Sequence, residues 1–291
     1  MVDIQNRTLF FGDNLKILQE KILDNVFDLI YLDPPFNSNR NYSVLFKEAG
    51  IDNSAQIHAF EDTWDWTEET VRLFTEMKNH PNPKIAILTN SLAEFVGHTP
   101  MMAYLVNMTA RLIPLHRVLK PTGSLYLHCD PTASHYLKII MDVIFSKENF
   151  INEIIWCYDT GGRAKRYFPR KHDTILWYTK SQEYNFYYEN VALARDTSTM
   201  HEPILHDEEG RPYQRNIKFG KEYRYYLDKG VLPNDWWVDL QAINPSAKER
   251  LGYPTQKPEA LLDRIINAVT KVTFPLCCFD QLSCWLPKDT S

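Results

Sequence analysis

Asp33, Pro34, Pro35 and Phe36 follow directly on an apolar run at residues 27–32. The Asp33 carboxylate only accepts hydrogen bonds, and the two prolines have no backbone N–H group to donate. Because the proline rings fix φ, the backbone carbonyls form a stiff wall of acceptors beside the flat apolar face of Phe36. A planar ring with an exocyclic NH2 group, such as a nucleobase, matches this set. If both hydrogens of that amine are held by acceptors, its nitrogen lone pair points outward and can attack an electrophile.

A second group of reactive residues lies near the C-terminal end, in the segment TQKPEALL. Pro258 suits the first position of a helix, which puts Lys257 at or just before the helix start. A cation there faces the positive end of the helix dipole and is unfavourable by itself. A bound anion reverses this, because Lys257 and the free backbone N–H groups can hold it together. We therefore expect an anion site at this helix start.

Basic residues are concentrated in the segment 159–180, although the whole chain has a net charge of −5. This local excess indicates a contact with phosphates, and a solvated surface loop is an equally good interpretation of the segment alone. The candidate phosphate-binding residues are Arg163, Lys165, Arg166, Arg170 and Lys171.

Asp33-Pro34-Pro35-Phe36 resembles the (D/N/S)PP(Y/F/W) motif of the DNA methyltransferases that methylate amino groups. Three further segments resemble the β class of that family: FFGDNLKIL, HRVLKPTGSLYLHCDPTASHYLK and GYPTQKPEALLDRII. In that class the catalytic motif comes first, the target-recognition region follows, and the cofactor motif comes last. The resemblance covers roughly residues 8–270.

The resemblance implies an enzyme of the restriction-modification type that transfers a methyl group from S-adenosylmethionine to adenine N6 in DNA. The target base must leave the duplex to be reached. Asp33 and the Pro34 carbonyl would then accept from the target amine, in a site stiffened by Pro35, while Phe36 stacks on the base. Asp33 is expected at an exposed strand end. Asp at this position is similar to the adenine-N6 members, and cytosine N4 stays open as the alternative target.

The same resemblance assigns cofactor and partners. Gly12-Asp13 resembles the turn that lies along S-adenosylmethionine, and the anion held by Lys257 and Pro258 is the methionine carboxylate of that cofactor. The implied partners are double-stranded DNA, contacted by the basic segment, and a cognate restriction endonuclease.

The elements that carry these residues follow an α/β pattern. Strand-length apolar runs at 27–32, 124–130, 152–158 and 173–179 alternate with helical patterns at 101–119, after Pro131, and at 258–269. This alternation predicts a doubly wound, mostly parallel sheet, the Rossmann-like fold of methyltransferases. Asp33 lies at the carboxyl end of a strand, where such sheets bind ligands.

We divide the chain into four parts. Residues 1–181 form the catalytic core, 182–253 the target-recognition region, 254–270 the cofactor-side helix and 271–291 a divergent tail. Within the second part, residues 184–253 are rich in tyrosine and charge and show little period, which predicts a loop-rich insertion that reads base edges.

The tail departs from the family pattern. The β class continues with a strand and a glycine-rich turn, DPFxGxGT, which lets the backbone approach the cofactor closely. The last of the ten glycines here is Gly252, and residues 271–291 have no clear period. We therefore expect a fold that is incomplete at its C-terminal end and lacks a central strand. The expected product is a damaged methyltransferase, from a frameshifted tail or a truncated gene, unless another route holds the cofactor.

Composition excludes several other classes. Apolar residues make up 44% and charged residues 24% of the 291, as in soluble globular proteins. No membrane-length apolar run or signal pattern is visible, so we expect a cytoplasmic protein without a membrane partner. The five cysteines contain no CxxC pair, which indicates neither a disulfide framework nor a zinc site.

Two competing functions remain. One is a DNA-binding pseudoenzyme that keeps the recognition region and lacks turnover. The other is a metal-dependent nuclease that uses Asp33 with His128, Asp130 or His135, although their spacing resembles no ligand set.

Overall fold

The computed structural model describes the chain except for residues 1–9, 11, 35–40, 46–55, 62–63, 160–163, 196–202, 245, 252–255, 271–275, 281–282 and 286–291. Of the residues assigned above, Pro35, Phe36 and Arg163 therefore lie outside the described part. No helix in the described part is both long and apolar enough to cross a bilayer.

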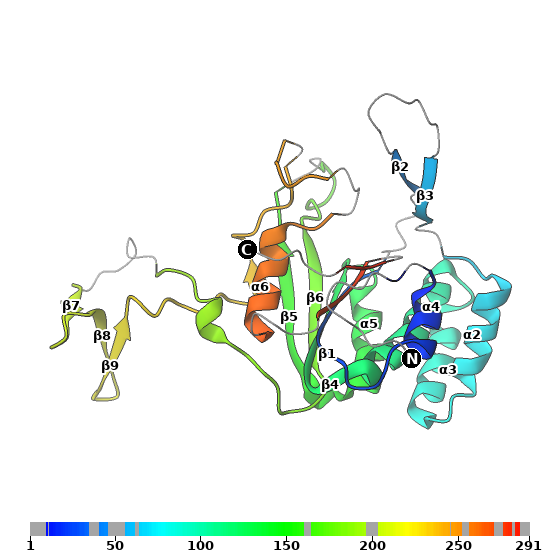
Figure 1. Cartoon of the computed structure of the whole chain (residues 1–291), viewed down its shortest axis with the longest axis horizontal. Coiled ribbons are helices and arrows are strands. Elements are labelled where there is room, and N and C mark those ends of the chain that lie inside the picture. The colour runs from blue at the N-terminus through cyan, green and yellow to red at the C-terminus, as the bar shows by residue number, and fades with distance from the viewer. Residues whose placement is uncertain are drawn as a thin grey trace.

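A seven-stranded sheet in the order β10-β5-β6-β4-β1-β11-β12 forms the centre of the molecule (Figure 1). β1 pairs in parallel with β4 and β11, and β10 pairs in parallel with β5, whereas β6 and β12 run against their neighbours. The sheet is thus mixed, with three parallel and three antiparallel pairings, and five of its seven strands run in one direction, so the predicted α/β class is confirmed. The strands are β1 (Phe27–Asp33), β4 (Leu119–Cys129), β5 (Phe150–Cys157), β6 (His172–Thr179), β10 (Trp236–Trp237), β11 (Leu276–Asp280) and β12 (Ser283–Trp285).

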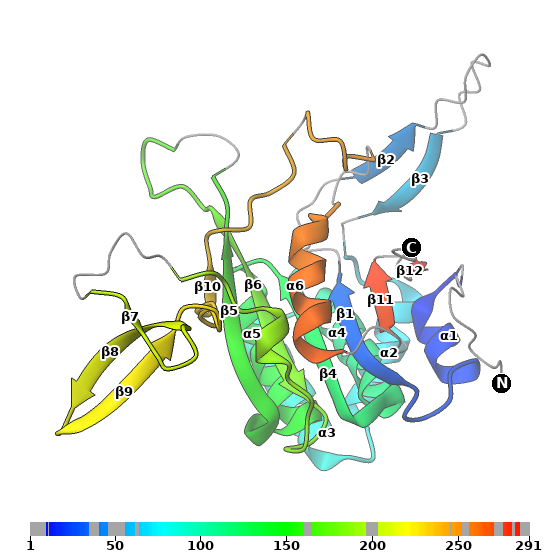
Figure 2. The same cartoon turned by 60° about the vertical axis from the view of Figure 1, so that its left-hand side comes forward.

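Helices cover both faces of this sheet, as a doubly wound fold requires (Figure 2). β1 is buried on both sides because its side chains alternate between two cores: Ile30 and Leu32 face one, Leu29 and Tyr31 the other. On the second face lies α6 (Glu259–Val269), which contributes Leu261 and Ile265. The helices on the first face are α1 (Asn14–Glu20), α2 (Glu68–Lys78), α3 (Pro83–Val96), α4 (Pro100–Val118) and α5 (Ser134–Met141).

α4 occupies the segment in which the sequence predicts a helix, and it is more deeply buried than a single apolar stripe implies. The side chain of Thr99 caps it by accepting from the Met102 N–H, and Pro100 starts it. Leu119 is already extended and pairs with Phe27, so α4 passes directly into β4.

The described residues of the region 184–253 lie mostly in loops, as predicted, with short strands among them, including β10 of the main sheet. The region contains a short 3-10 turn (Tyr188–Asn190) and an antiparallel sheet of β7 (Leu205–His206), β8 (Pro212–Lys218) and β9 (Lys221–Tyr226). In both views β8 and β9 form a hairpin that projects from the body (Figures 1 and 2). Both of its faces are largely exposed, so the alternation of apolar and polar residues that marks a half-buried strand is missing.

The tail also differs from expectation. Residues Leu276–Asp280 form β11, which lies beside β1 with Asp280 in register with Asp33, and β12 follows as an antiparallel strand. The expectation that a central strand is missing was therefore wrong. A strand enclosed by a sheet needs only a short apolar run, and it shows no repeating pattern of apolar residues by which it could be recognised. A second antiparallel pair, β2 (Asn41–Leu45) and β3 (Gln56–Glu61), lies outside the main sheet (Figure 2).

Candidate active site

The two ends of the expected site meet at the carboxyl end of β1. Nζ of Lys257 lies 2.6 Å from Oδ2 of Asp33, although 224 positions separate the residues in the chain. Both side chains are buried, with 11% of Lys257 and 7% of Asp33 exposed to solvent. The expectation of an exposed Asp33 was therefore wrong. Asp33 points to the face covered by α6, and the segment that leads into α6 covers it.

The start of α6 is shifted by one residue from its predicted position. Pro258 is extended and caps the helix, so it precedes the first helical residue, Glu259. The Glu259 N–H group donates to Oε2 of Glu249 at 3.0 Å, and that N–H is consequently not free. The loop is held further by Gln256, which donates to the Glu249 carbonyl and accepts from the Leu251 N–H.

These contacts test the fit of a carboxylate ligand. A carboxylate, that of Asp33, already binds Lys257, and a second one, that of Glu249, already binds the helix start. The Lys257 ammonium and the start of α6, to which the sequence assigned an anion, are thus each bound to a carboxylate of this chain. The positive charge of the lysine and the positive end of the helix dipole both favour such a partner. Their chemistry suits a carboxylate ligand, and the assignment of these groups to the methionine carboxylate of S-adenosylmethionine stays a prediction.

A hydrogen-bonded network of four side chains extends from the same end of the sheet. The Tyr31 hydroxyl lies 2.7 Å from Nδ1 of His128, Nε2 of His128 lies 3.1 Å from Asp173, and the Tyr158 hydroxyl donates to Asp173 at 3.1 Å. An ionised carboxylate only accepts hydrogen bonds, so the Nε2–H group of His128 donates to Asp173. The Tyr31 hydroxyl and Nδ1 of His128 form the other hydrogen bond of this ring. This network joins β1, β4, β6 and the residue after β5.

The sequence interpretation missed this network, except that it weighed His128 as a metal ligand. His128 is completely buried, and both of its ring nitrogens have protein partners. Within the described residues, no three His, Cys, Asp or Glu side chains form a group that could hold a metal ion. The nuclease alternative therefore gains no support. A signal was present, since His128 and Asp173 both occupy strand ends at the edge that carries Asp33.

The charges in this region act on one another. Burial by itself raises the pKa of Asp173, but the hydrogen bond and charge of His128 and the charge of Lys257 bring its pKa below the usual value. Burial, followed by the charge of Asp173 and the hydrogen bond to it, raises the pKa of Tyr158. Asp173 is thus a carboxylate at neutral pH, and Lys257 lies in the field of two anions, Asp33 and Asp173.

Gly12 and Asp13 form a turn at the start of α1. Gly12 has a φ of +132°, which glycine adopts without strain. The Asp13 carboxylate caps α1 by accepting from the Leu15 N–H at 3.1 Å, and it pairs with Arg111 of α4 at 3.1 Å. The structure therefore gives Asp13 a role in joining α1 to α4, and its place beside a cofactor stays a prediction.

The basic segment lies at the same edge of the sheet as Asp33. β4 and β5 both run antiparallel to β6, and β1 is parallel to β4, so β5 runs in the same direction as β1. The residues after β5 therefore leave from the edge of the sheet where β1 ends. Lys165, Arg166 and Arg170 are exposed, and Lys171 is half-buried. Lys180 has a different role, since its ammonium donates to backbone carbonyls of Arg117 and Leu119.

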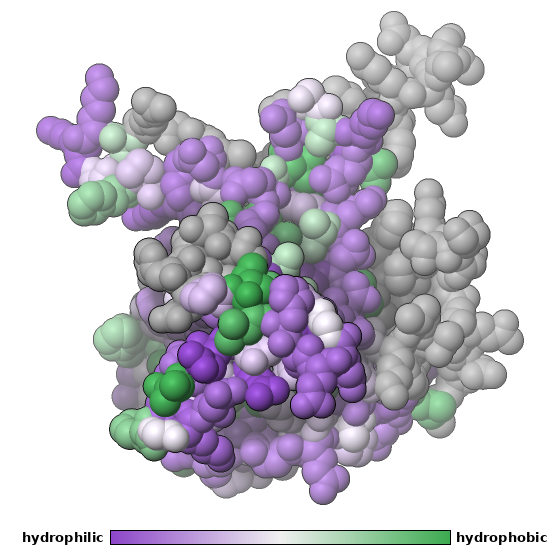
Figure 3. Space-filling model, turned by 90° about the vertical axis from the view of Figure 1, so that its left-hand side faces the viewer, coloured by the Kyte–Doolittle hydropathy of each residue, from purple (hydrophilic) through white to green (hydrophobic). Residues whose placement is uncertain are grey.

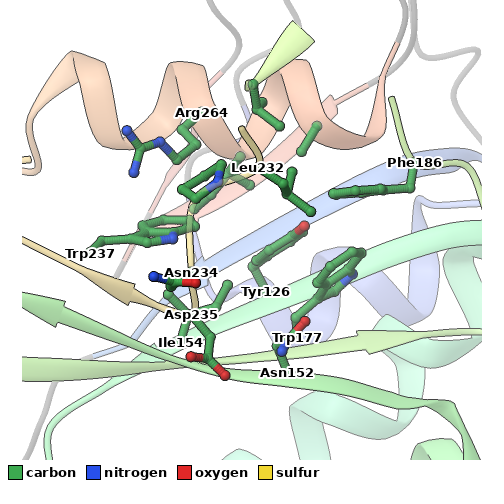
Figure 4. Close-up of a pocket in the computed structure, with 14 residues that line it drawn as sticks. Tyr126, Asn152, Ile154, Trp177, Phe186, Leu232, Asn234, Asp235, Trp237 and Arg264 are labelled. Carbon is green, nitrogen blue, oxygen red and sulfur yellow. The ribbon is translucent and has the colours of Figure 1, made fainter. Parts of the chain in front are cut away.

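A separate cavity of about 300 Å³ lies under α6, between that helix and strands β4, β5 and β6 (Figure 4). Tyr126 and Trp177 are stacked on its floor, with centroids 5.2 Å apart, and Arg264, Asn234 and Asp235 contribute polar groups. Neither Asp33 nor Lys257 lines it. This cavity is therefore not part of the site at the end of β1.

The face of the molecule that carries the β8–β9 hairpin is mainly hydrophilic, with small hydrophobic patches (Figure 3). The exposed apolar side chains on the hairpin are Ile217, Phe219 and Tyr223. They stand among the basic residues Arg215, Lys218, Lys221 and Arg224.

This chain is similar to known proteins in sequence and in fold. A model of a DNA methylase family matches residues 27–273. The type II methyltransferase M.BglII of Bacillus subtilis is 27% identical over 180 residues, which cover 59% of this chain and 46% of that protein. The DNA adenine methyltransferase YhdJ of Escherichia coli K12 is 26% identical over 263 residues, which cover 90% of this chain and 67% of that protein.

Among solved structures, the PvuII DNA methyltransferase, which is cytosine-N4-specific, matches 92% of this chain and 72% of its own with a TM-score of 0.51 and 11% identity. At this identity the match shows a shared fold. The chain spans less than half the length of M.BglII.

Proposed function

Since this chain belongs to the DNA methylase family whose model matches residues 27–273, we propose that it transfers a methyl group from S-adenosylmethionine to adenine N6 in DNA. Members of this family bind S-adenosylmethionine. The observation that carries the proposal is the buried carboxylate of Asp33 at the end of β1, bound to the lysine that precedes α6. Other sheets of this kind bind their ligands at the same edge.

In this proposal the chain holds the target amine. Asp33 and the carbonyl of Pro34 accept its two hydrogens, and the prolines keep these acceptors fixed. Phe36 stacks on the flipped base. Asp33 keeps the nitrogen lone pair aimed at the donor, so no covalent intermediate on the protein is required.

The cofactor supplies a methyl group on a sulfonium, which is the electrophile. Lys257 binds its carboxylate, next to Pro258 at the α6 start, and Gly12 and Asp13 border it. Asp173 contributes a second negative charge near Lys257.

Adenine is favoured over cytosine as the target. Asp at the first motif position is similar to the adenine-N6 members, and YhdJ, which matches 90% of this chain, is a DNA adenine methyltransferase. The cytosine-N4-specific PvuII enzyme is similar in fold alone.

DNA contacts are proposed for two regions. We assign the phosphate contacts to Arg163, Lys165, Arg166, Arg170 and Lys171, and recognition of the target sequence to residues 182–253. Residues 1–181 are the catalytic core, 254–270 the cofactor-side helix and 271–291 the divergent tail. A cognate restriction endonuclease is the proposed partner, as for type II and type III systems among the relatives.

A second candidate is a DNA-binding protein without turnover. The observation that favours it is the course of the tail: residues 271–291 contain no glycine, and β11 is followed by the antiparallel β12. A glycine-rich turn into a helix would instead let the backbone approach the cofactor.

One experiment separates these functions. The chain is incubated with plasmid DNA that lacks methylation and with S-adenosylmethionine, and the nucleosides are then analysed by mass spectrometry. We expect N6-methyladenine. N4-methylcytosine would reassign the target, and DNA binding without either product would support the second candidate.

A further inference from the structure

Asp33 and Lys257 are assigned to different ligands, yet the structure binds them to each other. The proposed function gives Asp33 the target amine and Lys257 the cofactor carboxylate. Nζ of Lys257 lies 2.6 Å from Oδ2 of Asp33, so Lys257 occupies the position proposed for the target amine, and Asp33 occupies the position proposed for the cofactor carboxylate. The ammonium stands where the amine would donate, and the carboxylate stands where the cofactor carboxylate would accept.

Because the Asp33–Lys257 pair is buried, it blocks access of ligands to both groups. Only 7% of the Asp33 side chain and 11% of the Lys257 side chain are exposed. While the pair persists, an incoming base cannot reach the carboxylate, and an incoming anion cannot reach the ammonium on its paired side. Pro34, the other proposed acceptor, is buried as well.

Separation of the pair needs a replacement charge. A buried ion that loses its partner is strongly unfavourable unless another group of opposite sign takes over. An anionic ligand provides that group for Lys257. The second carboxylate near Lys257, Asp173, remains in place because His128 and Tyr158 hold it.

We propose that Lys257 is exchanged from Asp33 to the carboxylate of the bound cofactor, and that this exchange uncovers Asp33 for the target amine. The inference rests on the proposed function and adds an order to it: cofactor first, base second. Without the cofactor, Lys257 keeps Asp33 covered, and a flipped base finds no acceptor there.

The exchange predicts that removing the charge of Asp33 and removing the charge of Lys257 change the affinity for the cofactor carboxylate in opposite directions. Asp33 competes with the cofactor carboxylate for Lys257, so removal of the Asp33 charge strengthens carboxylate binding. Removal of the Lys257 charge weakens it. If the pair were only structural, loss of either partner would disturb the site and weaken binding in both cases.

The test compares two neutral-sulfur ligands by calorimetry on the 291-residue chain. S-adenosylhomocysteine has the amino-acid carboxylate, and 5′-methylthioadenosine has the same adenosine and thioether without it. The variants are Asp33→Asn, Lys257→Gln and the two combined. Asn and Ser both occur at the first position of the (D/N/S)PP motif, so Asp33→Ser is the second variant if Asp33→Asn fails to fold.

We expect Asp33→Asn to bind S-adenosylhomocysteine about fivefold more tightly or better than the wild type. Lys257→Gln should reduce that affinity to the level of 5′-methylthioadenosine, and the combined variant should show no gain. Affinity for 5′-methylthioadenosine should be the same in all four proteins. Equal or weaker binding of S-adenosylhomocysteine by Asp33→Asn would overturn the exchange and leave the proposed function standing. Binding of neither ligand by any of the proteins would overturn both.

Discussion

At the carboxyl end of β1, Asp33 and Lys257 are buried and bound to each other, whereas at the turn between β8 and β9, Lys218, Phe219 and Lys221 lie in solvent. The first region has charges fixed by packing from several elements. The second is a hairpin with contacts between its two strands, such as Arg224 of β9 over the Tyr213 ring of β8. We infer that the first is built for chemistry on a small group and the second for contact with a large one.

The exposed side chains of the hairpin suit the DNA contact proposed for residues 182–253. Phe219 is fully exposed and has a φ of +53°, a conformation that is strained for a bulky residue. Its neighbours on the distal half of the hairpin are mainly basic, and the acidic residues 207–209 lie at the base of the hairpin. A two-stranded ribbon fits the major groove, and cationic side chains match its phosphates.

The largest expected effect is at Asp33. Asp33→Ala should lower methyl transfer by about 10²-fold or more, because the amine loses its main acceptor. It should also lower the free energy of unfolding by about 3–5 kcal/mol, because Lys257 is left buried without this partner. Methylation of plasmid DNA and urea unfolding measure the two effects. The control is Asp65→Ala at an exposed position. A variant with unchanged stability would show that the pair is loose in solution.

The His128 network should be the next most sensitive feature. Asp173→Asn removes a charge that accepts from His128 and Tyr158, and should lower the free energy of unfolding by about 1.5–3 kcal/mol at neutral pH. Because the pKa of Asp173 is lowered in the folded protein, its contribution is fully present above about pH 4 and is lost as pH falls through the folded pKa.

Urea unfolding between pH 7 and pH 2.5 measures this contribution. The difference between wild type and Asp173→Asn should be constant at higher pH and shrink in the acid range. Tyr158→Phe is the matched control, which removes one hydrogen bond and no charge. A difference that stays constant down to pH 2.5 would contradict the role of the carboxylate charge.

Charge removal in the basic segment should have an intermediate effect that is confined to DNA binding. Changing Arg163, Lys165 and Arg166 to Ala should weaken binding to all sequences. It should also lower the slope of log K against log salt by about 2.7, if each contacts one phosphate. Fluorescence anisotropy with a labelled duplex at several salt concentrations gives both values. Lys16, Lys84 and Lys147, changed together, are a control of equal charge, and an equal loss there would indicate only a long-range field.

The smallest effect is expected at Phe219. Phe219→Asn should leave stability unchanged or raise it by about 0.5–1 kcal/mol, because Asn tolerates a positive φ. It should weaken duplex binding by about fivefold, since an apolar ring that contacts base edges in the groove is lost. Thermal unfolding and anisotropy measure these changes, with Phe95→Asn as the control on an exposed face of α3. Unchanged DNA binding would remove the hairpin tip from the contact surface.

The elements that carry the motifs could be read from the sequence because each has one clear period or boundary. β1 is a continuous apolar run that ends at Asp33, and α4 and α6 show leucines and isoleucines at helical spacing. The fold class and the strand-end position of Asp33 follow from these patterns and from the resemblance.

The contacts between distant parts could not be read in this way. The Asp33–Lys257 pair depends on how the segment before α6 lies over β1, and no local pattern reports this. The same holds for His128 and Asp173, which are joined by strand pairing across β4 and β6. The β8–β9 hairpin was not predicted for another reason. It is exposed on both faces, so its strands show no alternation of apolar and polar residues, and two arginines, Arg215 and Arg224, lie opposite each other.

The position of β11 beside β1 has a consequence for synthesis of the chain. β1 ends at Asp33 and its parallel neighbour begins at Leu276, so one edge of β1 lacks this neighbour while the ribosome adds the residues between them. At about 5–20 residues per second this interval lasts about 10–50 s. During it, the N–H and C=O groups on that edge can pair with other chains, as any open strand edge can. This edge of β1 is closed only when residues 276–280 have emerged and pair with it as β11.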